Sequence, residues 1–363
     1  AGDACNSSPL YAHIEDSVET LTHLLTSILG LLPLVDSNKI VQAFAYLGEP
    51  YFQIGDTRIS TENNYTYTIA EIGVNHHNSL DKAKKMILSA KNGGATGVKF
   101  QTYKAEKIAA KDSPYYWDLK MESSTNQYDF FKKWDHFSDK DYIESAKYAN
   151  SIGIDFLSTP FDSDAIDFID PMVPFHKISS SDITNTPFLR HIASKKKPVI
   201  LSTGASTLSE IEVALETLYR SNCKDVVLLQ CILNYPTKFE NANLSMMNSL
   251  SKSFPNCHIG LSDHTLADEN MLVLTTAYTM GARVIEKHYT FDKTIKGGDH
   301  LHSMDEKDLS KLTKNIAFVN SLFGSELKAP LESEELARKN ARRSIIIQNK
   351  LSKGDIIMEK DLT

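Results

Sequence analysis

The sequence predicts an α/β protein whose main domain is an eight-stranded (β/α)8 TIM barrel. The first observation is that short apolar runs, rich in β-branched residues, alternate with helical patterns from about residue 67 onward. The second is that these runs are apolar almost throughout, which is typical of parallel strands covered on both faces. The third is their number, because eight such units within roughly 250 residues are what a closed barrel of this type requires.

The expected strands and the helices between them can be placed from local signals. The strands cover residues 67–73, 97–103, 155–161, 175–181, 198–204, 226–231, 258–263 and 283–290. One helix begins at the N-cap Ser79 and ends at the pair Gly93–Gly94. Another begins at a Thr207–Glu210 capping box. Residues 104–138 form a long aromatic and charged insertion after the second strand, which we expect to be a lid or a dimer contact.

The segments on either side of the barrel do not follow its pattern. Residues 1–52 form an N-terminal extension of unknown function, in which the apolar run 24–34 predicts an amphipathic helix because it is too short and interrupted for a membrane span. The segment 51–60 predicts a short β element, for which a hairpin closing the barrel bottom is one arrangement. We assign residues 53–330 to the barrel domain, and residues 331–363 to a linker and the beginning of a small β domain.

Composition narrows the class of partner. The net charge of -7 and the pI near 6.0 argue against a nucleic-acid partner and against a polybasic membrane surface. An anionic ligand would therefore have to be held by a local group of cations. The four cysteines contain no CxxC pair and are too few for a disulfide scaffold, which favours a reducing cytoplasm.

Polar residues follow the ends of the expected strands. In a barrel the carboxyl ends of all strands open at one mouth, where barrel enzymes hold their active sites. Alternation along a strand places Lys99 with Gln101, and Ser262 with His264, on one face. The residues expected at the mouth are Glu71, Lys99, Gln101, Ser158, Thr159, Lys177, residues 179–182, Ser202, Thr203, Tyr235, Ser262, His264, Glu286 and His288.

Two histidines at neighbouring strand ends, His264 and His288, predict a metal site. Together with Glu286 or Asp263 they suit a divalent ion that keeps positions open for substrate or water. The alternative is that each is a hydrogen-bonded core histidine. Their occurrence on adjacent strands, with a carboxylate between them, favours the metal.

Two lysines, Lys99 and Lys177, also lie at expected strand ends. A buried ammonium group is costly unless it meets an anion or a carboxylate. An ion pair with Glu71 is one interpretation, recognition of phosphate or carboxylate is another, and a Schiff base on Lys177 is a third. Anion-binding lysines beside a metal indicate a metal-assisted carbon–carbon bond reaction on an anionic substrate.

The motifs resemble those of a known family. "YTIAEIGVNHHNS", "GVKFQTY", "FLSTPFD", "FHKISSSD", "PVILSTG", "NYPT", "IGLSDHT", "VIEKHYT" and "GGDHLHSM" resemble, in order and spacing, the sialic acid (nonulosonate) synthases from about residue 53 to 363. The C-terminal "RRSIIIQNKLSKGDIIMEKDL" is similar to the start of that family's antifreeze-like (SAF) domain. The resemblance implies a homodimer that condenses phosphoenolpyruvate with an N-acetylated hexose, N-acetylmannosamine being the best candidate, to a nine-carbon sialic acid and phosphate.

The resemblance also implies roles for individual residues. His264 and His288 would hold Mn²⁺ or Mg²⁺, which polarises the sugar aldehyde, and Glu71 would orient or activate water near the reacting carbon. Phosphate would then leave by C–O cleavage. The positions that match phosphoenolpyruvate contacts are Lys99, Thr159, Lys177, Ser180, Ser202 and Ser262. The positions that match sugar contacts are Gln101, Asp182, Tyr235, Glu286 and Asp299.

The sequence departs from the family pattern at three points. Ile232 follows Cys231 where the family has a small polar residue, so one phosphoenolpyruvate contact is lost or moves to Asn234. Asp182 stands where many members have Glu, which shortens a sugar contact by one carbon. The family's antifreeze-like domain covers the partner subunit's mouth and contributes an Arg to the sugar, and no such Arg is identifiable here.

Other functions remain to be weighed. The "GGDH" loop favours neuraminate or legionaminate synthesis over pseudaminate synthesis. A phosphoenolpyruvate aldol synthase that makes a 3-deoxy keto acid phosphate would need a further phosphate clamp, and the loop "GGDHLHS" is not basic enough. A barrel that binds sugar acids without turnover would have no need to keep both the lysines and the histidines.

Overall fold

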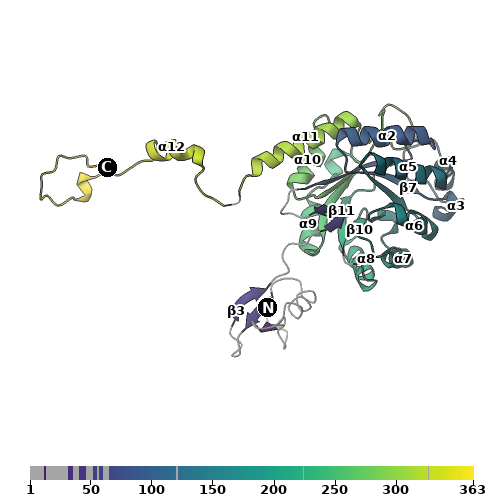
Figure 1. Cartoon of the computed structure of the whole chain (residues 1–363), viewed down its shortest axis with the longest axis horizontal. Coiled ribbons are helices and arrows are strands. Elements are labelled where there is room, and N and C mark those ends of the chain that lie inside the picture. Colours follow the sequence, from purple (N-terminus) through teal and green to yellow (C-terminus); the bar gives the residue numbers. More distant parts are fainter. Residues whose placement is uncertain are drawn as a thin grey trace. The chain divides into compact units, whose positions relative to one another are not determined.

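The computed structural model describes residues 12–13, 32–35, 41–45, 52–54, 57–59, 65–119, 122–223, 225–325 and 327–363. The chain divides into two compact units, Ala1–Val319 and Asn320–Thr363. Figure 1 shows the strands of residues 67–288, with helices arranged around them.

Eight parallel strands form one sheet, in the order β8-β7-β6-β13-β12-β11-β10-β9. They are β6 (Tyr67–Gly73), β7 (Gly97–Thr102), β8 (Asp155–Pro160), β9 (His176–Ile178), β10 (Val199–Ser202), β11 (Val226–Cys231), β12 (His258–Asp263) and β13 (Val284–His288). The two strands at the ends of this order, β8 and β9, contact each other, so the sheet curls into a barrel. The predicted (β/α)8 fold is therefore confirmed.

Each strand is followed by a helix that packs on the outside. These helices are α2 (Leu80–Gly93), α5 (Asp139–Ser151), α6 (Ser163–Ile169), α7 (Thr186–Ser194), α8 (Leu208–Arg220), α9 (Met246–Ser253), α10 (Leu272–Thr279) and α11 (Glu306–Phe323). The predicted N-cap is confirmed, because the Ser79 side chain accepts a hydrogen bond from the Lys82 amide. The predicted capping box of Thr207 and Glu210 is also present.

Two details of the barrel differ from or add to the expectation. The insertion after β7 contains the short helices α3 (Ala105–Ile108) and α4 (Gln127–Trp134). The strand expected over 175–181 ends at Ile178, and Ser180–Asp182 form one turn of 3-10 helix. The Ser179 hydroxyl accepts a hydrogen bond from the Ser181 amide, and such local bonds compete with a strand's ladder.

The described residues of the N-terminal extension are strands. β2 (Leu32–Val35) pairs in parallel with β1 (Ala12–His13) and antiparallel with β3 (Val41–Ala45). The helix expected over 24–34 is therefore wrong at its C-terminal end, and residues 24–31 lie outside the described residues. Pro33 explains the strand, because proline lacks the amide that a helix interior needs and clashes with the preceding turn.

The expected hairpin is confirmed, since β4 (Phe52–Ile54) pairs antiparallel with β5 (Thr57–Ile59). Phe52 is buried inside the barrel, with its ring centroid 6.2 Å from that of Phe175. Both residues belong to the amino-terminal end of the barrel, because Phe175 immediately precedes β9. The hairpin thus contributes a side chain that closes the bottom of the barrel.

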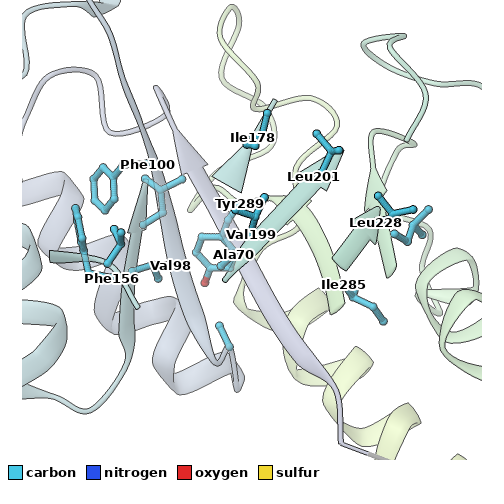
Figure 2. Close-up of a cluster of buried hydrophobic side chains, with 14 of the residues drawn as sticks. Ala70, Val98, Phe100, Phe156, Ile178, Val199, Leu201, Leu228, Ile285 and Tyr289 are labelled. Carbon is cyan, nitrogen blue, oxygen red and sulfur yellow. The ribbon is translucent and has the colours of Figure 1, made fainter. Parts of the chain in front are cut away.

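The barrel has an inner and an outer apolar core. The inner core consists of side chains from the first half of the strands together with the hairpin: Phe52, Tyr67, Ile69, Leu157, Phe175, Ile200, Val227, Leu229 and Val284. The outer core lies between strands and helices, and Figure 2 shows part of it, including Phe100, Phe156 and Leu201. Because side chains alternate along each strand, the residues that follow the inner core on the same face point into the mouth.

The C-terminal unit contains α12 (Glu335–Asn340) and an isolated antiparallel bridge between Ile347 and Leu362. Several of its isoleucines are exposed, among them Ile345 and Ile356. Among the residues that the structure describes, no helix has the length and apolar character needed to cross a membrane.

The buried His76 predicts acid sensitivity of the fold. Its imidazole lies 4.3 Å from the Phe137 ring and 5.4 Å from the Phe100 ring, and burial lowers its pKa from 6.5 to about 4. The unfolded chain binds a proton at His76 below pH 6.5, whereas the folded chain does not until about pH 4. The stability contributed by the neutral ring is complete above pH 6.5 and is lost as the pH falls to 4, which amounts to roughly 3 kcal/mol.

Urea unfolding of the wild type and His76→Phe at several pH values measures this contribution. The free energy of unfolding should fall less steeply between pH 6.5 and 4 in the variant than in the wild type. Parallel pH dependences would show that His76 is not the titrating group.

Candidate active site

On four strands of the barrel the inward side chains change from apolar to polar or charged within two residues. On β6 the inward side chain Ile69 is followed by Glu71, and on β13 Val284 is followed by Glu286. The same step gives Thr159 on β8 and Ser202 on β10, both buried. Groups that are distant in sequence therefore meet at the carboxyl ends of the strands.

Lys99 on β7 lies at the centre of these groups, which we call the charged layer. Its members are Glu71, Lys99, Thr159, Lys177, Ser202, Ser262 and Glu286. Its Nζ atom forms a salt bridge with Glu71, donates to Thr159 Oγ1 at 2.9 Å and lies 3.9 Å from Glu286 Oε2. Glu71 also accepts a hydrogen bond of 3.0 Å from Gln101 Nε2. The ion pair of Lys99 and Glu71 that the sequence offered as one interpretation is therefore present.

Lys177 on β9 forms the second half of the layer. Its Nζ atom donates to Ser202 Oγ at 2.7 Å and to the Ile178 carbonyl at 3.0 Å. It also lies 3.9 Å from Glu286 Oε1, which accepts a hydrogen bond of 2.9 Å from Ser262. Glu286 thus lies between the two lysines, among the residues expected to contact phosphoenolpyruvate rather than with the other sugar-binding candidates.

Burial and charge act in opposite directions on this layer. Burial raises the pKa of Glu71, with a further contribution from Glu286, and this outweighs the effect of Lys99. Burial would also raise the pKa of Glu286, but Lys177 and Lys99 together lower it below its usual value. Burial lowers the pKa of Lys177, whereas for Lys99 the same effect is overcome by Glu286 and Glu71, which raise its pKa. Two ammonium groups and two carboxyl groups thus share one buried layer.

Three side chains near the layer form a cluster that could hold a metal: His288, Asp299 and His302. His288 Nδ1 lies 3.3 Å from Asp299 Oδ2, and His302 Nε2 lies 3.8 Å from Asp299 Oδ1. Burial lowers the pKa of both histidines well below 6.5, so both rings are neutral, the form that binds metals. Neither of these nitrogens has a hydrogen-bond partner in the described part of the chain, which fits a divalent ion.

His264, the other predicted metal ligand, lies beside this cluster. Its ring centroid is 5.4 Å from that of His288. His264 Nδ1 donates to the Ile232 carbonyl at 2.7 Å, which leaves Nε2 as the nitrogen available to a metal. The structure therefore brings the predicted pair together, although the cluster above contains His288 and not His264.

Two residues that we did not assign to the site hold its parts together. Asn75 is fully buried, accepts a hydrogen bond from the Asp299 amide at 3.0 Å and donates to Ser303 Oγ at 3.2 Å. Gly73 has a φ of +51°, and a Cβ there would lie 2.9 Å from Glu71 Oε1 and 3.1 Å from Gln101 Nε2. Both belong to the motif "YTIAEIGVNHHNS", which was the available signal. His302 was also missed, and its signal was the spacing Asp299-x-x-His302.

The remaining candidates differ in how closely they approach the mouth. Ser180 Oγ accepts a hydrogen bond of 2.9 Å from the Gly204 amide and so joins the ends of β9 and β10. The ring of Tyr235 lies 4.2 Å from that of His264. Asp182 bonds with Ser181 and Asn185 instead, and Asn234 is exposed, with its carbonyl accepting from Thr237.

Two residues expected at the mouth point elsewhere. Ser158 bonds with Thr102 at 2.7 Å, and Thr203 Oγ1 donates to the Leu229 carbonyl at 2.9 Å. Alternation explains both, since their neighbours Thr159 and Ser202 occupy the inward positions. Their expected place in the pocket is therefore wrong.

The fold and this mouth are those of a TIM-barrel protein with a buried layer of lysines and carboxyl groups and a histidine–carboxylate cluster. Residues 86–328 match the model of the NeuB family. The chain is 42% identical over 303 residues to the N,N'-diacetyllegionaminic acid synthase of Legionella pneumophila, covering 82% of this chain and 84% of that protein. It is 33% identical to the human N-acetylneuraminate-9-phosphate synthase, with 82% of each chain covered.

A solved structure agrees with this assignment. The N-acetylneuraminic acid synthetase of Leptospira borgpetersenii, in complex with citrate, matches with a TM-score of 0.70 and 29% identity, covering 80% of this chain and 96% of that one. The chain belongs to the NeuB family of nonulosonate synthases, and the resemblance seen in the sequence is confirmed.

Replacing Glu286 tests whether the layer is built for an anion. Glu286→Gln keeps the shape but leaves the lysines short of one negative charge, which should lower the free energy of unfolding by about 3 kcal/mol. A matched change is Asp263→Asn, which leaves the buried Lys287 without its carboxylate partner at 2.5 Å. Added phosphate should restore much of the lost stability in Glu286→Gln. It should not do so in Asp263→Asn, because Lys287 lies on the outer face of the barrel, where the wild type bonds it to Asp263 and the Thr265 carbonyl.

Thermal unfolding of both variants with and without phosphate makes the comparison. An equal response of the two variants to phosphate would contradict an anion-binding role for the layer.

Proposed function

We propose that the protein condenses phosphoenolpyruvate with an acetamido hexose to a nine-carbon 2-keto acid, releasing phosphate. The observation that carries the proposal is the presence, in one barrel mouth, of two buried lysines and a histidine–carboxylate cluster. The two lysines suit an anionic substrate, and the histidine–carboxylate cluster suits an aldehyde that a metal ion activates. Membership of the NeuB family supports the same reaction.

The charged layer would hold phosphoenolpyruvate. Lys99 and Lys177 would bind its phosphate and carboxylate, which replace part of their present contacts with Glu71 and Glu286. The hydroxyls of Thr159, Ser202 and Ser262 already bond with members of this layer and would donate to the same ligand. Ser180 is a further candidate that rests on the resemblance alone, and Asn234 is one because the sequence departs from the family pattern at Ile232.

The chain's residues would then direct three bond changes. The methylene carbon of phosphoenolpyruvate forms a bond to the aldehyde carbon, whose oxygen takes up a proton. Water adds to C2 and gives up a proton, and the bond between C2 and the bridging oxygen breaks to release phosphate. Glu71 is suited to accept the proton from water, because burial raises its pKa above the usual range. A divalent ion, Mn²⁺ or Mg²⁺, held by His264 and His288 would supply Lewis-acid polarisation of the aldehyde.

The sugar would lie over the outer part of the mouth. Gln101, Tyr235 and Asp299 are partly exposed there and are the best placed of the sugar-binding candidates. The sequence favoured N-acetylmannosamine, whereas the 42% identity to a diacetyllegionaminic acid synthase, against 33% to the human neuraminate-9-phosphate synthase, favours a diacetamido hexose. We propose the diacetamido hexose first, N-acetylmannosamine second and the pseudaminate precursor third.

The assembly of the chain is also a proposal. Residues 53–330 would form the catalytic barrel of a cytoplasmic homodimer, after an extension of residues 1–52, and residues 331–363 would be a linker and the start of an antifreeze-like domain. Exposed isoleucines of the C-terminal unit, including Ile345 at 77% and Ile356 at 82%, support a partner surface for that segment.

Phosphate release tests the function. The protein is incubated with phosphoenolpyruvate and Mn²⁺, and with each of the three acetamido sugars in turn. One sugar should support release, and removal of the metal with a chelator should abolish it. Lys177→Met should lower kcat/KM by at least about 100-fold, because the lost ammonium group neutralises charge on phosphoenolpyruvate.

The matched control is Lys147→Met, which removes a lysine whose side chain is 69% exposed on α5. This variant should keep full activity. Metal-dependent binding of phosphoenolpyruvate without release from any sugar would indicate a barrel that binds its ligands without turnover. The absence of any binding would contradict the proposed function.

A further inference from the structure

The unpaired nitrogen of His302 points to a role that the sequence did not assign. His302 is only 3% exposed, and its Nε2 atom has no hydrogen-bond partner among the described residues. The Nδ1 atom of His288 also has no hydrogen-bond partner among the described residues. Each unpaired buried nitrogen costs roughly 1–3 kcal/mol, so two of them side by side indicate a site for a group that both can bind.

The distances in the cluster suit one metal ion. Two donors on a single ion, with bonds of about 2.1 Å, lie about 3 Å apart when adjacent and about 4.2 Å apart when opposite. The contacts of Asp299 with His288 at 3.3 Å and with His302 at 3.8 Å fall within this range. All three donor atoms lie within 4.8 Å of one another. One ion could therefore contact all three after small movements.

The loop that carries Asp299 and His302 is held in place by other bonds. Ser303 Oγ donates to the Asp299 carbonyl at 2.6 Å, and Asn75 accepts from the Asp299 amide. His300 in the same loop faces another way, with Nε2 2.8 Å from His77 Nε2 and Nδ1 2.7 Å from Thr290 Oγ1. The loop thus presents one of its two histidines to the cluster and uses the other to fix its own position.

We propose that His302 is a metal ligand together with His288 and Asp299, and that this site takes a first-row transition ion such as Mn²⁺ in preference to Mg²⁺. Imidazole nitrogens favour transition ions, whereas Mg²⁺ prefers oxygen ligands and retains its water. The inference rests on the proposed function for the presence of a metal in the mouth. It adds a ligand beyond His264 and His288, and it gives Asp299 a metal contact.

The first experiment measures metal affinity without substrates. Metal-free wild type, His302→Gln and the control His191→Gln, which removes a histidine of α7 that bonds with Asp167, are titrated calorimetrically with Mn²⁺ and with Mg²⁺. His302→Gln should weaken Mn²⁺ binding by at least about tenfold and Mg²⁺ binding by less than about threefold, while His191→Gln should keep both affinities within about twofold of the wild type. Unchanged Mn²⁺ affinity in His302→Gln would overturn the inference.

The second experiment needs no variant, in case His302→Gln does not fold. Anomalous diffraction from crystals of the wild type grown with Mn²⁺ locates the ion. A position about 2.2 Å from His302 Nε2 supports the inference, and an ion bonded to His264 and His288 but more than about 3 Å from His302 overturns it.

These results separate the inference from the proposed function. A wild type that binds Mn²⁺ through His302 but releases no phosphate would contradict the synthase and leave the metal site standing. A wild type that releases phosphate and binds its metal without His302 would do the reverse.

Discussion

The ammonium groups of Lys99 and Lys177 lie inside a barrel whose lower half is filled by apolar side chains. A buried charge without a partner costs several kcal/mol, so each lysine requires nearby carboxylates and hydroxyls. Glu286 lies 3.9 Å from both lysines, and Glu71 forms a salt bridge with Lys99. The other polar groups of the layer bond with these four. Two carboxyl groups thus lie against two ammonium groups in one layer, and under the proposed function an anionic ligand would replace part of these contacts.

The same two strands supply both halves of the mouth. β12 carries Ser262 and is followed directly by His264, and β13 carries Glu286 and His288, with one residue between the members of each pair. Side chains at this spacing on one face are about 7 Å apart. The charged layer and the histidine cluster are thus adjacent, as the proposed reaction between two bound substrates requires. Asn75 ties the loop after β6 to the loop after β13 and so fixes the cluster above the layer.

The fold and the layer could be predicted because both depend on periodicity. Eight apolar runs located the strands, and alternation placed Lys99 with Gln101 and Glu286 with His288 on the inner face. The Leu32–Val35 strand was missed because its apolar run was interpreted as one side of a helix, although Pro33 is unfavourable in a helix interior. Ser158 and Thr203 were wrongly placed in the mouth because the prediction did not consider to which face of the strand each side chain points.

The contributions of His302 and Asn75 could not be derived from periodicity. Both lie in irregular loops, where the direction of a side chain depends on bonds to distant residues. His300 and His302 are two positions apart, yet one faces His77 and the other faces Asp299. Periodicity also could not predict that Glu286 lies between the two lysines, because this position depends on partners from β7 and β9.

The most direct test of the account follows an oxygen atom through the reaction. Phosphoenolpyruvate carrying ¹⁸O in the bridge between C2 and phosphorus is condensed with the accepted acetamido sugar, and the released phosphate is weighed by mass spectrometry. The label is expected to leave with the phosphate, because water adds to C2 and the C–O bond breaks. Unlabelled phosphate would mean that water attacks phosphorus, and it would contradict the proposed chemistry of the barrel mouth.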